Sequence, residues 1–260
     1  MTNSRHPYLA RTGPLLFAHR GGTADGLENS LHAFRRAASL GYRYLETDVH
    51  TTADGELVAF HDTTLDRVTD GRGRIADLTW EQVSRARIAG REPVPRFADL
   101  LRELPQAHWN VDAKTDAALV PLLEEIERAG AWDRVCVGSF SEARVARARS
   151  LAGPRLATSL GTRAVVGLRL LSRGGRMVPP RLLGEAALRG AVCVQVPERH
   201  AGVRVVDAAF VRTAHHYGLQ VHVWTVNEAD RVHRLLDLGV DGIMTDDLEM
   251  LLRVADDRAR

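Results

Sequence analysis

The chain has 260 residues, a length that suits one large domain with a sizeable core. Hydrophobic residues make up 45% and charged residues 26%, which is ordinary globular composition and excludes a disordered, fibrous or disulfide-stapled protein. The 35 basic residues nearly cancel the 33 acidic ones, so the formal charge of +2 gives no electrostatic reason to expect nucleic acid as a partner.

The sequence gives no sign of a membrane segment or a leader. A membrane span needs roughly 18 to 20 apolar residues in a row, and the first apolar run, Pro14–Ala18, is far shorter. The two cysteines, Cys136 and Cys193, sit in apolar runs without Cys-x-x-Cys or zinc spacing, as buried thiols do. We therefore expect a cytoplasmic protein without a transmembrane segment; its oligomeric state is left open.

Short apolar, β-branched runs predict eight strands, which alternate with segments of helical spacing such as Leu31, Phe34 and Ala38. Alternating strands and helices favour right-handed parallel βαβ units, and eight such units close a TIM (β/α)8 barrel. We therefore predict an α/β protein with one barrel domain over residues 1–260. The predicted strands are 15–18, 44–49, 109–113, 135–140, 156–160, 192–196, 220–226 and 242–245.

The long stretch between the second and third predicted strands must hold extra structure. Asp54-Gly55 separates two strand-like runs, which is a strong signal for a β-hairpin. If these two residues form the centre of the turn, the residue numbers of two positions that pair across the hairpin add up to 109. His61 then lies opposite Asp48. Residues from 62 to about 96 then form a small polar insertion with at most one short helix, after Thr79.

Carboxylates gather where the predicted strands end, which is the side of a barrel that carries the active site. Glu46 and Asp48 point to one side of their strand because side chains alternate, and Asp112 comes from the next strand. Three clustered carboxylates raise one another's pKa values unless a cation neutralises them, and an all-oxygen set suits Mg²⁺ or Ca²⁺ better than zinc. We therefore expect a divalent metal there; ion pairs with the many arginines are the alternative.

Two histidines, one lysine and one tryptophan complete the candidate site. His19 and His61 reach the same rim from different elements and offer a general acid and a general base. Lys114 is the single lysine among 35 basic residues and lies two positions after Asp112, at the end of the same predicted strand. Its compact ammonium group is suited to binding an oxyanion at this place. Trp224 offers a flat apolar wall for a small-molecule substrate, although a core position is equally consistent with its strand.

Several enzyme classes lack their motifs here. No P-loop, His-Glu-x-x-His, His-x-His or Gly-x-Ser-x-Gly pattern occurs in the sequence. Their absence disfavours nucleotide hydrolases, zinc peptidases, dinuclear amidohydrolases and α/β-hydrolase esterases.

Eight short motifs follow one another along nearly the whole chain. They are His19–Gly22, Glu28–Ser30, Glu46–Val49, His61–Asp62, Asn110–Lys114, Ser139–Phe140, Trp224–Asn227 and Gly239–Asp246. In these motifs the chain resembles the glycerophosphodiester phosphodiesterases, a family of the barrel class that also includes the phosphatidylinositol-specific phospholipases.

The resemblance implies a barrel with an insertion after the second strand, and metal-dependent hydrolysis of glycerophosphodiesters to sn-glycerol 3-phosphate and an alcohol. Glu28 and Asn29 would either support the site residues from behind or lie at the rim of the site. One histidine would act as the acid and the other as the base, in an order left open, on either water or the adjacent glycerol hydroxyl as nucleophile. By position, the catalytic pair would be His19 and His61, the phosphate contacts Arg20 and Lys114, and the metal ligands Glu46, Asp48 and Asp112.

One position departs from the family pattern. The third metal ligand is commonly glutamate, whereas Asp112 is one methylene shorter. The metal would then sit closer to the third strand, bind Asp112 through water, or be a different ion.

Two alternatives remain open. A lysophospholipase D-type enzyme with the same site would act at a membrane surface, and its cue is the apolar run Ala164–Leu171 followed by Arg173, Arg176 and Arg181. The same run also fits an outer helix of the barrel, without lipid contact. A non-catalytic phosphodiester-binding barrel is disfavoured because both histidines, all three carboxylates and Lys114 are present.

Overall fold

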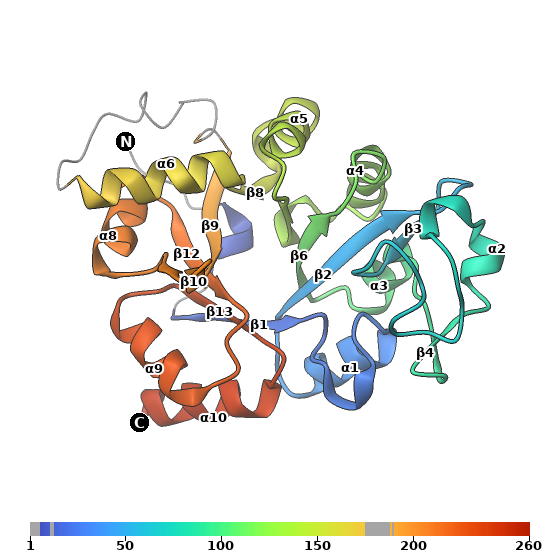
Figure 1. Cartoon of the computed structure of the whole chain (residues 1–260), viewed down its shortest axis with the longest axis horizontal. Coiled ribbons are helices and arrows are strands. Elements are labelled where there is room, and N and C mark those ends of the chain that lie inside the picture. Colours follow the sequence, from blue (N-terminus) through green and yellow to red (C-terminus); the bar gives the residue numbers. More distant parts are fainter. Residues whose placement is uncertain (1–5, 11–12, 175–187, 189) are drawn as a thin grey trace. The chain divides into compact units, whose positions relative to one another are not determined.

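The computed structural model describes residues 6–10, 13–174, 188 and 190–260 (Figure 1). The chain divides into two compact units, which are described separately. The N-terminal unit is Phe17–Val135 together with Asp246–Leu248. The C-terminal unit contains Cys136–Thr245 and Glu249–Arg260, as well as the first residues of the chain.

The N-terminal unit is built on three parallel strands and one antiparallel strand. In the parallel pairs, His19 lies beside Glu46, and Asp48 lies beside Asp112. The side chains expected to do chemistry are therefore neighbours across strands. The strands and helices of this part are β1 (Leu15–His19), α1 (Leu31–Ser39), β2 (Tyr44–Thr51), β3 (Leu57–Ala59), α3 (Phe97–Glu103), β6 (His108–Ala113) and α4 (Leu119–Arg128). It also contains the short 3-10 helices Ala24–Gly26 and Trp132–Arg134, whereas the 3-10 helix Pro7–Leu9 belongs to the C-terminal unit.

Aromatic packing holds the helices of this unit against its strands. Ser30 caps α1 by accepting a hydrogen bond from the Ala33 N–H, and Phe34 one turn later is fully buried. The Phe34 ring meets Trp109 of β6 edge-on at 5.0 Å, and Phe97 of α3 meets the same indole at 5.9 Å. Each such side chain contributes roughly 1.5–3 kcal/mol by burial, which holds α1 and α3 against β6.

The hairpin after β2 forms, but its predicted register is wrong by one residue. Val49 pairs with Ala59 and Thr51 with Leu57, so paired positions sum to 108 rather than 109. The Thr52 N–H donates to the Glu56 carbonyl, which makes a three-residue turn that ends on Gly55 with φ of +89°. Phe60, not His61, therefore lies opposite Asp48, whose carbonyl accepts the Phe60 N–H at 2.9 Å.

The insertion has a small core of its own. Leu65, Ile75, Val83 and Ile88 are fully buried in one cluster with Phe60, so the polar surface of the insertion covers an apolar interior. The expected short helix is present, and it begins after Thr79. Besides the 3-10 turn Ile75–Asp77, the insertion contains α2 (Trp80–Val83), β4 (Arg87–Ile88) and β5 (Glu92–Pro93).

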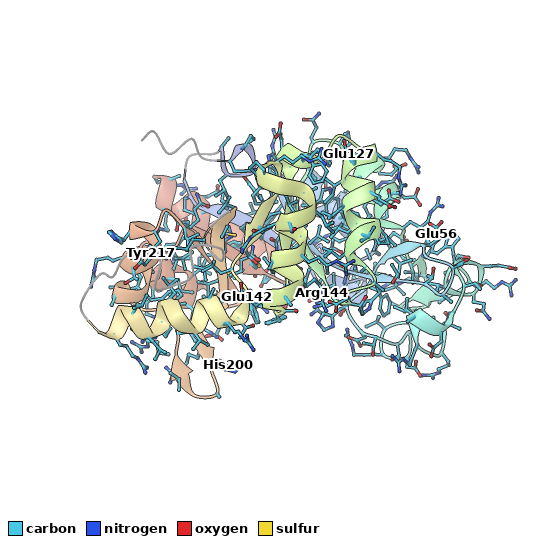
Figure 2. The ribbon with its side chains drawn as sticks, turned by 90° about the horizontal axis from the view of Figure 1, so that it is seen from above. Glu56, Glu127, Glu142, Arg144, His200 and Tyr217 are labelled. Carbon is cyan, nitrogen blue, oxygen red and sulfur yellow. The ribbon has the colours of Figure 1, made fainter. Side chains whose placement is uncertain are left out.

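The C-terminal unit continues the strand–helix alternation with five parallel strands, so all eight predicted strands are confirmed. Cys136 and Cys193 are free thiols and fully buried, as expected. An antiparallel hairpin, on which His200 is labelled in Figure 2, follows its third strand. The elements are β7 (Val135–Gly138), α5 (Glu142–Ala152), the 3-10 turn Gly153–Arg155, β8 (Ala157–Ser159), α6 (Thr162–Arg173), β9 (Ala191–Pro197), β10 (Arg199–His200), β11 (Val203–Arg204), α8 (Ala208–His216), β12 (Gln220–Trp224), α9 (Ala229–Asp237), β13 (Gly242–Thr245) and α10 (Leu248–Ala259).

Over the described residues, none of the helices combines the length and the apolar character needed to span a membrane.

Candidate active site

The turn after β1 places the first histidine. The Gly22 N–H donates to the His19 carbonyl at 2.9 Å, and Gly22 has φ of +86°. A Cβ atom on Gly22 would come within 2.9 Å of Leu248 Cγ, so this close approach requires glycine. The same turn directs the Arg20 N–H at Glu46, where it donates to Oε2 at 3.1 Å.

Two carboxylates of β2 are buried side by side. Glu46 is 6% exposed and Asp48 is 2% exposed. Burial, followed by the negative charge of Asp48, raises the pKa of Glu46 to about 7, although His19 and Lys114 act in the opposite direction. Burial alone would also raise the pKa of Asp48, but the charges of Lys114 and Arg20 lower it below its ordinary value. The strand therefore carries one carboxyl group that resists ionisation beside one that is held ionised.

Lys114 lies between two carboxylates. Its Nζ atom is 2.6 Å from Asp48 Oδ1 and 2.8 Å from Asp112 Oδ2. Burial would lower the pKa of Lys114, but the charges of Asp48 and Asp112 raise it. Arg20 Nε also lies 3.4 Å from Asp48 Oδ2. Two of the three carboxylates, Asp48 and Asp112, are thus ion-paired, chiefly with Lys114 rather than with the arginines of the chain.

His19 is held by a carboxylate from a distant part of the sequence. Its Nδ1 lies 2.7 Å from Asp246 Oδ1, and its Nε2 lies 3.8 Å from Glu46 Oε2. The side chain is only 15% exposed, and burial alone would lower the pKa of His19. The carboxylates of Glu46 and Asp246 outweigh burial and raise this pKa above its ordinary value.

His61 is held by the residue that follows it. Its Nδ1 lies 2.6 Å from Asp62 Oδ1, and its side chain is 34% exposed. Arg67 in turn donates to Asp62 from Nε at 2.6 Å and from Nη2 at 3.1 Å. These hydrogen bonds from Arg67, helped by the one from His61 and partly opposed by burial, lower the pKa of Asp62 to about 2. Asp62 is therefore a carboxylate at any working pH.

Glu28 and Asn29, expected either behind the site residues or at the rim, are buried. Glu28 accepts hydrogen bonds from Arg20 at 3.0 Å and from Arg67 at 2.7 Å. Burial would raise the pKa of Glu28, but these two guanidinium groups lower it. Asn29 accepts a hydrogen bond from the Thr47 hydroxyl at 2.8 Å and is 1% exposed, so it braces β2 from behind.

The three carboxylates expected to bind metal offer only oxygen atoms, which is the donor chemistry that a hard divalent cation prefers. In the part of the chain that the structure describes, no three or more His, Cys, Asp or Glu side chains are grouped so as to hold a metal ion. Lys114 supplies the positive charge between Asp48 and Asp112. The oxygen ligands of Glu46, Asp48 and Asp112 thus suit such a cation, and the Lys114 ammonium lies between two of these carboxylates, Asp48 and Asp112.

All but one of the predicted site residues belong to the N-terminal unit. Trp224 is in the C-terminal unit, where its ring meets Phe140 edge-on at 5.8 Å. Its role as a wall for substrate stays a prediction.

Two residues that help to hold His19 and His61 were not predicted from the sequence: Asp246, which contacts His19, and Arg67, which contacts Asp62. Asp246 was visible in the motif that ends the eighth strand, and a polar residue at that end of a barrel strand was a usable signal. Arg67 lies within the insertion and gave none, because its partners are defined only by the fold.

Comparison with known proteins shows which family the chain belongs to. Residues 19–250 match the model of the glycerophosphoryl diester phosphodiesterase family. A Mycobacterium tuberculosis protein named "Probable glycerophosphodiester phosphodiesterase 2" is 42% identical over 94% of this chain and 91% of its own length. A glycerophosphodiester phosphodiesterase of Caldanaerobacter subterraneus is 29% identical over 92% of this chain and 97% of its own.

Solved structures show the same fold. A glycerophosphodiester phosphodiesterase from Agrobacterium tumefaciens aligns with a TM-score of 0.72 at 23% identity, over 91% of this chain and 98% of that one. An Oleispira antarctica phosphodiesterase, solved in complex with the product sn-glycerol-3-phosphate, aligns with a TM-score of 0.77 at 19% identity, over 94% and 97%. The chain therefore has the (β/α)8 barrel fold, is a phosphoric diester hydrolase, and belongs to the glycerophosphoryl diester phosphodiesterase family.

Proposed function

We propose that the protein hydrolyses glycerophosphodiesters to sn-glycerol 3-phosphate and an alcohol, with His19 and His61 as the acid–base pair. The observation that carries this proposal is the pair of histidines in one unit, each with Nδ1 within 2.7 Å of a carboxylate oxygen. The glycerol 3-phosphate part is supported by the Oleispira antarctica relative, whose structure contains that product.

The histidine–carboxylate contacts favour proton transfer at the opposite ring nitrogen. A carboxylate that accepts a hydrogen bond from Nδ1–H keeps the proton there and leaves Nε2 to exchange protons with the substrate. One histidine then takes the proton of the attacking water or glycerol hydroxyl, and the other gives a proton to the departing alkoxide. Each transfer is worth roughly 10²- to 10⁴-fold in rate. A cyclic glycerol phosphate, if seen by ³¹P NMR during turnover, would identify the glycerol hydroxyl rather than water as nucleophile.

Arg20 and Lys114 are suited to neutralise the phosphoryl oxygens. Both are cationic and largely buried, with side chains 16% and 19% exposed. An ammonium has three N–H groups, and two of those on Lys114 face Asp48 and Asp112. The third suits a phosphoryl oxygen, and charge contacts of this kind are stronger in a site that excludes water.

We further propose that Glu46, Asp48 and Asp112 hold a divalent cation, Mg²⁺ or Ca²⁺. When bound, such an ion neutralises negative charge on the phosphoryl oxygens. The support is the all-oxygen donor set on adjacent strands, with Asp48 directly beside Asp112 in the register of β2 and β6.

The test is release of glycerol 3-phosphate from glycerophosphocholine by protein stripped of metal, with Mg²⁺, Ca²⁺, Mn²⁺ or no ion added back. We expect product only when an ion is present. Product without any ion would contradict the metal proposal and leave the two-histidine reaction standing. Folded protein that binds glycerophosphocholine but forms no product with any ion would contradict the proposed reaction and favour a non-catalytic binding barrel.

A second candidate, cleavage of lysophospholipids at a membrane surface, is favoured by α6. Val166 and Leu170, one turn apart on this helix, are 52% and 63% exposed, while Leu168 packs inward. Arg173 ends the helix, and Arg176 and Arg181 of the predicted lipid-binding stretch lie outside the described residues.

Sedimentation with vesicles tests this candidate. Binding that requires anionic lipid and is lost in the double variant Val166→Ser, Leu170→Ser would support peripheral lipid contact. Equal sedimentation of the variant and the parent would argue against α6 as the contact.

A further inference from the structure

One arginine of the insertion connects the two halves of the proposed reaction site. The Arg67 guanidinium binds two carboxylates, each through two hydrogen bonds, an arrangement that we call a double fork. Its Nε and Nη2 atoms donate to Asp62 at 2.6 and 3.1 Å, and its Nη1 and Nη2 atoms donate to Glu28 at 3.0 and 2.7 Å. Both carboxylates are thus held in a two-point contact by the same planar group.

Each of these carboxylates has a second partner that the proposed reaction uses. Asp62 contacts His61 Nδ1 at 2.6 Å, and Glu28 accepts a hydrogen bond from Arg20 Nη1 at 3.0 Å. The result is an unbroken chain of side chains, His61–Asp62–Arg67–Glu28–Arg20, which we call the Arg67 clamp. One end is a proposed proton-transfer group, and the other is a proposed phosphate contact.

We propose that Arg67 is a positioning residue, which orients His61 through Asp62 and Arg20 through Glu28 and so sets the spacing between proton transfer and phosphate binding. This inference rests on the proposed function of His61 and Arg20. It adds a role for the insertion, because the hydrogen bonds of the Arg67 side chain to described residues go to Asp62 and Glu28 and not directly to His61 or Arg20.

The backbone around Arg67 is anchored well enough to carry this role. Leu65, two residues before it, is 1% exposed in the core of the insertion, and Val68, the next residue, packs against the same cluster. The Thr69 N–H donates to the Leu65 carbonyl at 3.2 Å, which closes a turn around Arg67. The insertion therefore presents a guanidinium on a rigid loop, although the Arg67 side chain itself is 48% exposed.

The clamp needs an arginine in particular. A guanidinium has five N–H donors in one plane and can bind two carboxylates by two points each, whereas a lysine ammonium is a point charge with three donors. The low pKa of Asp62 is consistent with this geometry, because hydrogen bonds from Arg67 are its largest cause. Removing the fork frees both carboxylates, and with them the ring of His61 and the guanidinium of Arg20.

The experiment compares Arg67→Ala and Arg67→Lys with a matched control, Arg96→Ala. Arg96 makes a similar two-point contact with Asp99, at 3.0 and 3.4 Å, and is similarly exposed at 38%. In the described part of the chain its ion-pair partners are Asp99 and Glu56, and neither of them pairs with a histidine. We expect Arg67→Ala to lower kcat and to raise KM, with about a 10- to 100-fold loss in kcat/KM. Arg96→Ala should leave both constants near the parent values.

The two arms of the clamp can be separated. Asp62→Asn should lower kcat with little change in KM, because His61 loses its carboxylate partner while Arg67 keeps its two-point contact with Glu28. Glu28→Gln should chiefly raise KM, because it releases Arg20. Methylguanidinium added to Arg67→Ala should restore part of the lost kcat, and Arg67→Lys should remain impaired because an ammonium cannot form the double fork.

A readout that does not need turnover keeps this inference distinct from the proposed function. In ¹⁵N-labelled, metal-free protein, the His61 ring should show its proton on Nδ1, and Arg67→Ala should convert this signal to a mixture of tautomers. If the parent protein proves inactive but the tautomer still changes, the proposed function fails and the clamp stands. An unchanged His61 tautomer, or parent-like kcat and KM in folded Arg67→Lys and Arg67→Ala, would overturn the clamp.

Discussion

The two histidine–carboxylate pairs use the same contact but are built in opposite ways. Asp246 lies 227 residues after His19, so that pair forms only once the chain has folded. Asp62 directly follows His61, so that pair is present in the sequence itself. The first pair is also more buried, with a histidine 15% exposed against 34% in the second.

The two pairs depend on different supports as a result. His19 and Asp246 are held by strand ends and by the contact of the Gly22 turn with Leu248, whose carbonyl accepts the Tyr42 hydroxyl at 2.8 Å. The local pair is oriented by an exposed guanidinium from the insertion. The adjacent residues His61 and Asp62 are thus oriented by a third side chain, Arg67. His19 and Asp246, which are distant in the sequence, are held by the packing of the strands and turns that carry them.

The largest expected effect concerns the histidines themselves. His19→Ala and His61→Ala should each lower kcat by roughly 10²- to 10⁴-fold, because each removes one proton transfer. His215→Ala is a matched control, since His215 also contacts an aspartate, Asp241, at 2.7 Å. Rates of glycerol 3-phosphate release would measure the loss, and a near-parent rate in either site variant would break the proposed pairing of roles.

Substitution of Asp246 and Asp62 tests whether the more buried histidine–aspartate pair contributes more to the rate of the reaction. We expect Asp246→Asn to lower kcat by about 10- to 100-fold and Asp62→Asn by about tenfold or less. At 15% exposure His19 has less access to solvent that could replace its lost partner than His61 has at 34%. The same assay at saturating substrate measures both variants, and an equal or reversed order would show that exposure does not decide their importance.

The support of the long-range pair can be tested by adding one methyl group. Gly22→Ala places a Cβ atom 2.9 Å from Leu248 Cγ and should destabilise the fold by about 1–3 kcal/mol. Gly55→Ala at the hairpin turn has a similar φ of +89° but nothing within 4 Å, so only the left-handed backbone penalty of about 1 kcal/mol should remain. Thermal unfolding of both variants gives the comparison, and equal losses would show that the Leu248 contact is not limiting.

The smallest expected effect is on stability in acid. The pKa of Asp62 is lowered to about 2, so its ion pair stabilises the fold fully above about pH 4, and this contribution disappears as the pH falls through 2. Because the pair is partly exposed, the amount is below about 1 kcal/mol. The difference in Tm between the parent and Asp62→Asn should therefore shrink from pH 5 to pH 3. A difference independent of pH would mean that Asp62 stabilises the fold by packing rather than by charge.

The strands could be predicted because each is a short apolar run of its own. His19, Glu46 and Asp48 followed from these runs, since alternation and strand ends place side chains without any knowledge of distant partners. The hairpin register could not be predicted from Asp54-Gly55 alone. The two-residue and three-residue turns both suit this dipeptide, and the Thr52 hydrogen bonds to Asp54 and Glu56 favour the longer one.

Contacts between distant charged residues could not be predicted for a different reason. With 34 arginines in the chain, composition does not say which one binds Glu28 and Asp62, and only the fold of the insertion selects Arg67. The pairing of Lys114 with two carboxylates was likewise hidden, because a lysine at that position suits phosphate equally well. The single-domain organisation, the cytoplasmic location and the role of Trp224 stay predictions.

Lys114 has a practical consequence as the only side-chain amine of the chain. Acylating reagents attack unprotonated, accessible amines, and this one is held as an ammonium between Asp48 and Asp112 and is 19% exposed. Any lysine acylation detected in the intact protein must therefore come from the centre of the candidate site. The rate of acylation at Lys114, read from the peptide that contains this residue, therefore reports on the candidate site without an engineered label.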